Sequence, residues 1–79
     1  MGITVFFWGQ LVEITQKEFI TIDTIPKTLT HLCDELNFTF PGLKGKTYAI
    51  SVNKKFASNM ELELKSGDEI AFMPPFAGG

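Results

Sequence analysis

Hydrophobic side chains alternate with other residues at the start of the chain, the pattern typical of a β-strand. Residues 3–8 are β-branched and aromatic, and a strand places successive side chains on opposite faces. The two faces are Ile3, Val5 and Phe7, and Thr4, Phe6 and Trp8. Both faces are apolar toward residue 8, which indicates a central strand. If the protein's own core covers only one face, Phe6 and Trp8 remain for another contact.

Further strands are predicted at residues 18–23, 47–53 and 69–73, with a short edge strand at Phe56 and Ala57. Gly9 interrupts the first strand, and residues 10–17 are expected to form a polar connection. Leu11, Val12 and Ile14 would anchor that connection partially. Because the connection is short, the strands at 3–8 and 18–23 are expected to pair as an antiparallel hairpin.

One helix is predicted between the second and third strands. Pro26 suits its first turn, and Thr28 is an alternative N-cap. The helix should end near Asn37, because Pro41 and Gly42 indicate a turn, and residues 37–46 are expected to be irregular. Its apolar stripe, at spacings i, i+3, i+4 and i+7, is formed by Leu29, Leu32, Cys33 and Leu36.

The order strand, strand, helix, strand, short strand, strand predicts an α+β domain with a β-grasp, ubiquitin-like architecture. We expect a mixed sheet of four to five strands, with the first and last long strands paired at its centre. One main helix would cover one face of the sheet. Residues 1–73 would form this domain and residues 74–79 an extended C-terminal tail.

Composition narrows the function classes. A chain of 79 residues allows a single domain, and 44% hydrophobic residues with eight Phe indicate a packed core. The net charge of −2 argues against a nucleic-acid partner, and the seven cationic residues are all lysines, which lack the bidentate fork of arginine. No apolar run is long enough to cross a membrane. We expect a cytoplasmic protein without a membrane partner.

The residues offer no catalytic or metal-binding set. The single histidine, His31, and the single cysteine, Cys33, lie two residues apart and so point to different faces of the predicted helix. Cys33 belongs to the apolar stripe and is expected in the core, with His31 on the solvent side. A metal site needs several converging ligands, and a nucleophilic cysteine needs an activating neighbour and exposure. We therefore expect no bound metal or cofactor, and a chain that is acted upon by other proteins.

The C-terminal stretch has a distinctive composition. Pro74 and Pro75 fix φ at about −65° and lack backbone donors, so this segment cannot continue a central strand. After the bulky Phe76, the chain narrows to Ala77, Gly78 and Gly79. A backbone without side chains can enter a channel too narrow for a Cβ atom. We expect the tail to present the α-carboxylate of Gly79.

Three segments resemble the small, sulfur-carrying subunits of molybdopterin synthases. Residues 67–79 read GDEIAFMPPFAGG and resemble the family's C-terminal signature. Residues 5–14 read VFFWGQLVEI and resemble its opening strand and the loop that follows, and residues 52–54 match a shorter element. Together they span nearly the whole chain. The chain departs from the family pattern at Trp8 and Met73, where Phe is commoner, and at Val12, where the family usually has Arg. The resemblance implies that the chain lacks the contact that this arginine makes at the rim of a partner.

The resemblance implies a mechanism centred on Gly79. A ubiquitin-activating-like adenylyltransferase would use ATP to form an acyl-adenylate at Gly79, and sulfur would replace AMP to give a thiocarboxylate. The tail would enter the catalytic large subunit of molybdopterin synthase, where sulfur passes to a cyclic pterin monophosphate to build the dithiolene. Two small subunits would flank a dimer of large ones. The partner-binding patch would comprise Phe6, Trp8, Phe56 and Met73.

Three other functions remain open. The chain could be a sulfur carrier for thiamine synthesis or tRNA thiolation, although thiamine carriers generally lack the Pro-Pro step. It could be a protein modifier conjugated to lysines through Gly79. It could also be a plain interaction module, for which the two terminal glycines would be dispensable. The patch residues, too, have an alternative reading as ordinary core residues.

Overall fold

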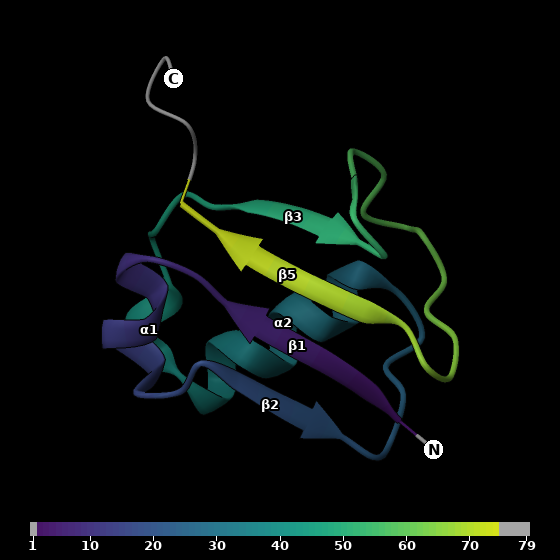
Figure 1. The fold of residues 1–79 in the computed structure, drawn as a ribbon, viewed down its shortest axis with the longest axis horizontal. Coiled ribbons are helices and arrows are strands. Elements are labelled where there is room, and N and C mark those ends of the chain that lie inside the picture. The colour runs from purple at the N-terminus through teal and green to yellow at the C-terminus, as the bar shows by residue number, and fades with distance from the viewer. Residues whose placement is uncertain (1, 75–79) are drawn as a thin grey trace.

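The computed structural model describes residues 2–74, which form an α+β domain with a β-grasp fold (Figure 1). The predicted tail residues 75–79 lie outside the described residues. The elements in chain order are β1 (Ile3–Phe7), α1 (Gln10–Thr15), β2 (Phe19–Ile22), α2 (Leu29–Thr39), the 3-10 helix η1 (Pro41–Leu43), β3 (Ala49–Val52), β4 (Lys55–Phe56) and β5 (Glu69–Met73).

The sheet has five strands in the order β2-β1-β5-β3-β4. The central pair, β1 and β5, is parallel, with Phe7 opposite Phe72, and the other neighbouring pairs are antiparallel. The prediction of a mixed sheet with the first and last long strands at its centre is therefore confirmed. The antiparallel pairing of β1 with β2 is confirmed too, with Phe6 opposite Phe19.

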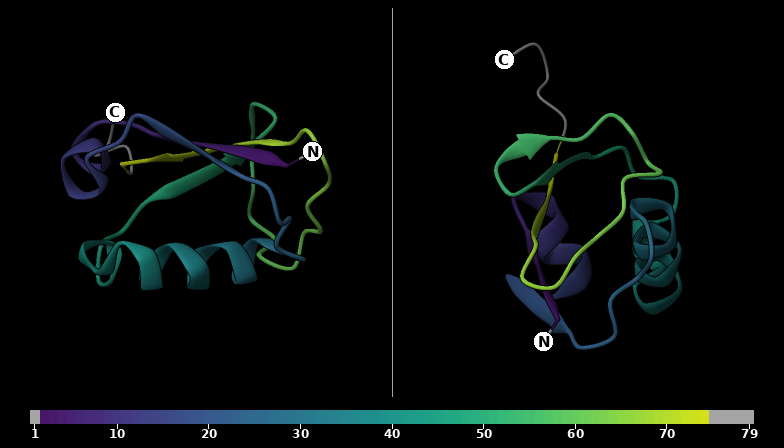
Figure 2. Two further views of the ribbon diagram at one scale, coloured as in Figure 1. Left: turned by 90° about the horizontal axis from the view of Figure 1, so that it is seen from below. Right: turned by 90° about the vertical axis from the view of Figure 1, so that its right-hand side faces the viewer.

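The core lies between the sheet and α2, which covers one face only (Figure 2). The side chains of β1 and β5 that point toward α2 are almost inaccessible to solvent, as the alternating pattern of the sequence predicted. The helical stripe supplies the opposite wall of the core. The predicted strand face and the predicted stripe are buried throughout, together with two residues of β5: Ile3, Val5, Phe7, Leu29, Leu32, Cys33, Leu36, Ile70 and Phe72.

The helix α2 begins at Leu29 because Thr28 is its N-cap. The Thr28 side chain accepts a hydrogen bond from the backbone N–H of His31 at 3.3 Å. The helix runs two residues beyond the predicted end at Asn37 and is closed by a bond from the Phe40 N–H to the Leu36 carbonyl at 2.7 Å. The segment after it is less irregular than expected, because Pro41 opens a 3-10 turn.

The prediction of a polar connection at residues 10–17 was wrong, since six of these residues form the helix α1. Leu11 and Thr15, four residues apart, are the buried residues of this helix, and the Thr15 hydroxyl donates a hydrogen bond to the Leu11 carbonyl at 3.0 Å. The helical pattern of residues 10–15 was hard to recognise in the sequence because Gly9 indicates a break and the helix is short. Gly9 is its N-cap, and Gln16 ends it in a left-handed conformation.

The shorter strands differ in length from the prediction. The third strand covers four residues, and the edge strand lies at Lys55–Phe56, one residue earlier than expected. In the segment at 60–65, Leu64 is buried in the core, while Glu63 makes an isolated bridge with Thr28. The segment at 60–65 lies against the start of α2, since the Leu29 N–H donates a hydrogen bond to the Leu62 carbonyl at 3.1 Å.

Two titratable groups meet at the edge of the core. Tyr48 lies close to the side chains of Cys33 and Asn37. Burial raises the pKa of the Cys33 thiol, an effect that the neighbouring Tyr48 hydroxyl partly opposes. Burial, reinforced by Cys33, raises the pKa of Tyr48 from 10.0 to about 12. The neutral forms of both groups are therefore favoured in the folded state, and Cys33 is a core residue rather than an activated thiol.

Replacing Thr28 with Ala should lower the free energy of unfolding by about 1 kcal/mol, because the His31 N–H loses its side-chain acceptor. Thr28→Ser keeps the accepting oxygen and is the matched control. Chemical denaturation of the two variants measures the difference. Equal stability of the Ala and Ser variants would show that the cap is not formed.

The pKa of Tyr48 predicts a loss of stability at alkaline pH. Folded Tyr48 retains its proton up to about 12, whereas an unperturbed tyrosine loses it near 10.0. The unfolded state therefore binds fewer protons in this window, and the free energy of unfolding should fall as pH rises from 10 to 12. Tyr48→Phe should be less stable at neutral pH but show a shallower decline. Parallel pH profiles for wild type and variant would contradict this account.

Candidate functional site

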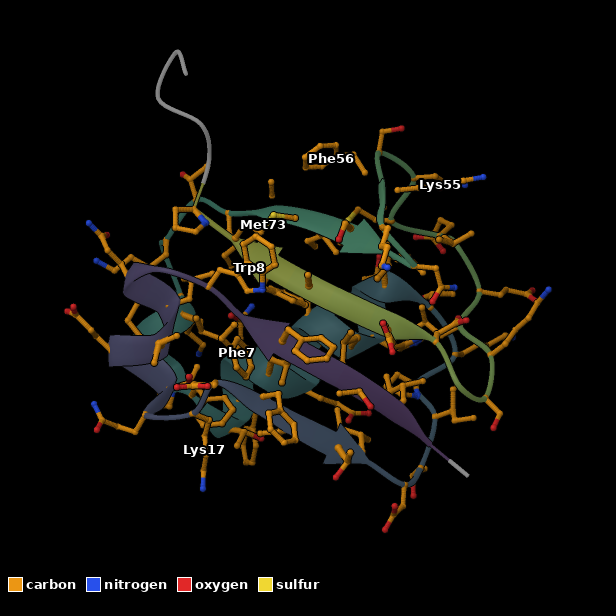
Figure 3. All side chains as sticks on the ribbon, viewed as in Figure 1. Phe7, Trp8, Lys17, Lys55, Phe56 and Met73 are labelled. Carbon is orange, nitrogen blue, oxygen red and sulfur yellow. The ribbon has the colours of Figure 1, made fainter. Side chains whose placement is uncertain are left out.

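The face of the sheet away from α2 carries a continuous apolar surface. Figure 3 looks onto this face, with Trp8 and Met73 near the end of β5 and Phe56 beyond β3, at the edge of the sheet. The side chains surround a hollow of ≈ 460 Å³. The residues that line this hollow, which we call the open-face hollow, are Phe6, Trp8, Ser51, Lys54, Phe56, Glu69, Ala71 and Met73. The four residues predicted as a partner-binding patch thus converge on one site.

These four side chains contribute in different ways. Trp8 is 56% exposed and Phe56 is 67% exposed, so both present aromatic surface to solvent. Met73 is only 8% exposed, so its burial resembles that of a core residue, the alternative that the sequence left open. It stands apart from the buried cluster under α2 and lines the open-face hollow from the end of β5. Phe6 is half-buried. Large exposed apolar patches of this kind usually mark a surface for another molecule.

The position of Phe56 depends on a tight turn between β3 and β4. Asn53 and Lys54 both have positive φ, at 53° and 74°, which a two-residue hairpin turn with the right twist requires. The Asn53 side chain fastens this turn to the start of β5. It donates to the Asp68 carboxylate at 3.0 Å, and its oxygen accepts from the Glu69 N–H at 3.0 Å. The rim of the open-face hollow is therefore held by the central sheet.

The apolar surface continues past Trp8 to the edge strand β2. A second hollow of ≈ 450 Å³ is lined by Phe6, Phe7, Trp8, Gly9, Val12, Glu18 and Phe19. The rings of Phe6 and Phe19 lie 6.0 Å apart and are tilted by 42°. Phe19 is an exposed aromatic residue that the sequence reasoning did not assign to the patch. The sequence could have indicated this position, because the antiparallel pairing of the two strands puts Phe19 directly opposite Phe6, on the same face of the sheet.

Val12, which stands where the resembling family usually has Arg, lies on α1 and lines this second hollow. The charged side chain at the same hollow is Glu18. The surface beyond Trp8 is therefore apolar with one acidic side chain, and it lacks the positive charge that an arginine at residue 12 would place beside Glu18. A partner surface that matches it would be apolar or basic at this point.

The strand β5 leads from the open-face hollow to the predicted tail. Met73 is the last residue of the strand, and Pro74 follows it directly. The other predicted tail residues, Pro75, Phe76, Ala77, Gly78 and Gly79, lie outside the described residues. The hollow thus borders the point where the chain leaves the sheet.

The described residues contain no group of three or more His, Cys, Asp or Glu side chains that could hold a metal ion. His31 is exposed and Cys33 is buried, as predicted. Within residues 2–74 there is also no helix with the length and apolar character needed to cross a membrane. Among the described residues, the apolar face is the feature that stands out as a site.

Comparison with known proteins places the chain among small sulfur-carrier-like domains. The ThiS family model matches residues 5–79. A molybdopterin synthase sulfur carrier subunit of Phaeosphaeria nodorum is 34% identical over 58 residues, which cover 61% of this chain and 60% of that relative. The chain thus matches less than two thirds of that relative's length.

Two solved structures extend the comparison. Subunit 1 and 2 of the molybdopterin-converting factor from Helicobacter pylori form a complex whose matching chain is 32% identical, with full coverage of both chains and a TM-score of 0.73. A molybdopterin converting factor, subunit 1, from Pyrococcus furiosus has a TM-score of 0.87 at 17% identity, covering 95% of this chain and 98% of that one. The second likeness shows the fold alone. Taken with the match over residues 5–79, these findings confirm the family resemblance seen in the sequence: the chain belongs to the ThiS family.

Proposed function

We propose that this chain is the sulfur carrier of a molybdopterin synthase. The observation that carries the proposal is the position of the apolar face, whose hollow is lined by Met73 immediately before the Pro-Pro-Phe-Ala-Gly-Gly segment. A partner that covers this face also receives the tail. The names of the relatives in Phaeosphaeria nodorum and Helicobacter pylori support this assignment.

The proposed chemistry takes place at the carboxylate of Gly79. A carboxylate is a poor acyl donor, so an oxygen of Gly79 first attacks the α-phosphate of ATP, and pyrophosphate leaves. Sulfide then displaces AMP from the acyl carbon and leaves a thiocarboxylate. The thiocarboxylate sulfur forms a bond to a side-chain carbon of the cyclic pterin monophosphate while a carbon–oxygen bond at that carbon breaks and the oxygen leaves, and water then cleaves the acyl–sulfur bond to restore the carboxylate. Two such cycles supply the two sulfurs of the dithiolene.

The residue types of the tail suit this chemistry. Gly78 and Gly79 have no side chain, so their backbone fits a narrow channel in both the activating enzyme and the synthase. Pro74 and Pro75 restrict the backbone at the base of the tail, which lowers the entropy lost when the tail becomes ordered in a partner. Phe76, which lies in the sequence between these two pairs, would offer one apolar side chain to a partner.

The apolar face is the proposed docking surface for the large subunit. Trp8 and Phe56 are aromatic and exposed and both line the open-face hollow, and aromatic residues dominate the binding energy of many interfaces. Met73 and Phe6 complete the hollow's lining. The large subunit would supply the catalytic residues, so this chain would be a non-catalytic subunit of a sulfurtransferase. An adenylyltransferase of the ubiquitin-activating type would be its second partner.

Carriers for thiamine synthesis or tRNA thiolation, and protein modifiers, would share the adenylation step. They differ in what accepts the acyl group or the sulfur. Isopeptide adducts on other proteins that depend on Gly79 would favour the modifier. Sulfur transfer to a pterin favours the molybdopterin synthase subunit. We favour this assignment because the Pro-Pro step precedes the Gly-Gly end.

Deleting Gly79 should abolish molybdopterin formation and leave the fold intact, because residues 2–74 build the domain without it. Reconstitution with the activating enzyme, a sulfur source and the large subunit measures the activity, and thermal unfolding followed by circular dichroism measures the fold. A variant with one alanine added after Gly79 is a matched control for the position of the acyl group, and it should also be inactive. Molybdopterin formation by the truncated protein would defeat the carrier assignment.

Replacing Trp8 with Lys should weaken binding to the large subunit by about 2 kcal/mol or more, because it places a charge on the apolar contact. The matched control is Phe38→Lys. Phe38 is 86% exposed on α2, away from the open face, so its replacement should leave affinity unchanged. Calorimetry measures both. Equal affinities for the two variants would remove Trp8 from the interface.

A further inference from the structure

Gly9 and Pro74 are in close contact where the chain leaves the central pair of strands. Gly9 follows β1 by two positions and has φ 60° and ψ −134°. A Cβ atom added to Gly9 would lie 2.8 Å from Cγ and 3.3 Å from Cδ of Pro74. The first distance is shorter than van der Waals contact allows. Glycine is therefore required at this position for its backbone conformation and for the space it leaves to the proline ring.

The backbone hydrogen bonds around this contact show why β5 ends here. The Trp8 N–H donates to the Phe72 carbonyl at 3.0 Å, one step beyond the strand β1. In a parallel pair the next bond would run from residue 74 to the Trp8 carbonyl, but proline has no N–H. The Trp8 carbonyl instead accepts from the Leu11 N–H at 3.1 Å as the chain enters α1. The ladder thus stops at Pro74, and packing against Gly9 replaces it.

We infer that Gly9 is a positioning residue that seats the Pro74 ring and fixes the direction in which the tail leaves the sheet. This inference rests on the proposed function for its consequence, because the direction matters only if Gly79 must reach a partner's active site. Gly9 also lines the second hollow beside Trp8, so the seat and the docking surface share one wall. A partner bound at Trp8 would therefore meet the tail at a defined starting point.

Two other glycines help to separate the two reasons for a glycine at residue 9, which are its positive φ and the space it leaves for the Pro74 ring. Gly45 and Gly67 also have positive φ, at 81° and 88°, but an added Cβ at either would meet no atom within 4 Å. A substitution at Gly67 therefore tests backbone strain without a clash. At Gly9 the clash is with Cγ and Cδ of Pro74, and these are the atoms that Pro74→Ala removes while it retains Cβ.

The experiment compares wild type, Gly9→Ala, Pro74→Ala, the double variant and the control Gly67→Ala. Each full-length protein is converted to the thiocarboxylate, and single-turnover sulfur transfer is measured at saturating large subunit. The dissociation constant for the large subunit and the melting temperature are measured in parallel. The double variant keeps the positive φ at residue 9 but lacks the clashing ring atoms. The backbone strain of an alanine at residue 9 is therefore the same in the wild-type and Pro74→Ala backgrounds, and the difference between the two backgrounds measures the clash alone.

We expect Gly9→Ala to slow the transfer step by about 10- to 100-fold relative to wild type, the cost of a displaced reacting group. The dissociation constant should change far less than the rate. In the Pro74→Ala background the same substitution should cost about threefold or less, because the seat is already empty. Gly67→Ala should leave the rate unchanged. Equal losses in both backgrounds, or a loss for Gly67→Ala as large as for Gly9→Ala, would overturn the inference.

A separate measurement distinguishes failure of the inference from failure of the proposed function. If the wild-type protein cannot be thiocarboxylated or cannot transfer sulfur, the proposed function fails. The seat is still tested by NMR, as a nuclear Overhauser effect between the Gly9 α protons and the Pro74 γ protons in the full-length wild-type protein. The inference requires this signal, and its loss in Gly9→Ala. Absence of the signal in the wild type would overturn it.

Discussion

The parallel pairing of β1 with β5 is the interaction on which the other features of the structure depend. It joins the first and last strands at the centre of the sheet, with Phe7 opposite Phe72. Because the two strands run in the same direction, their C-terminal ends lie together. Trp8 and Gly9, which follow β1, therefore lie beside Met73 and Pro74 at the end of β5, and the proposed docking surface adjoins the point where the chain leaves the sheet.

The same two strands separate the protein's apolar side chains into two sets. Side chains of one parity meet α2 and form a core that is almost closed to solvent. Those of the other parity, from Phe6 through Ala71 to Met73, line the open-face hollow. A small domain has little core to spare, so apolar residues left outside it are costly unless another molecule covers them. In this protein the second set is best explained by a partner.

The sequence was sufficient for the fold class, the central pairing of the first and last strands and the helical stripe, because period-two and period-3.6 patterns are strong in β1, β5 and α2. It was insufficient for α1, where Gly9 suggested a simple break and two buried positions four residues apart carried the only helical signal. The sequence left open whether Met73 is exposed or buried, since parity gives the face of a side chain but not what surrounds it. The contact between Gly9 and Pro74 joins residues distant in the sequence and requires coordinates.

The most direct test of the central claim is the intact mass of the protein after incubation with ATP, the activating adenylyltransferase and a sulfur source. The account predicts the mass increase of one oxygen replaced by one sulfur, located by fragmentation at Gly79. It also predicts that the increase is lost once the large subunit and the cyclic pterin monophosphate are added. An unchanged mass, or sulfur located at Cys33, would contradict the account.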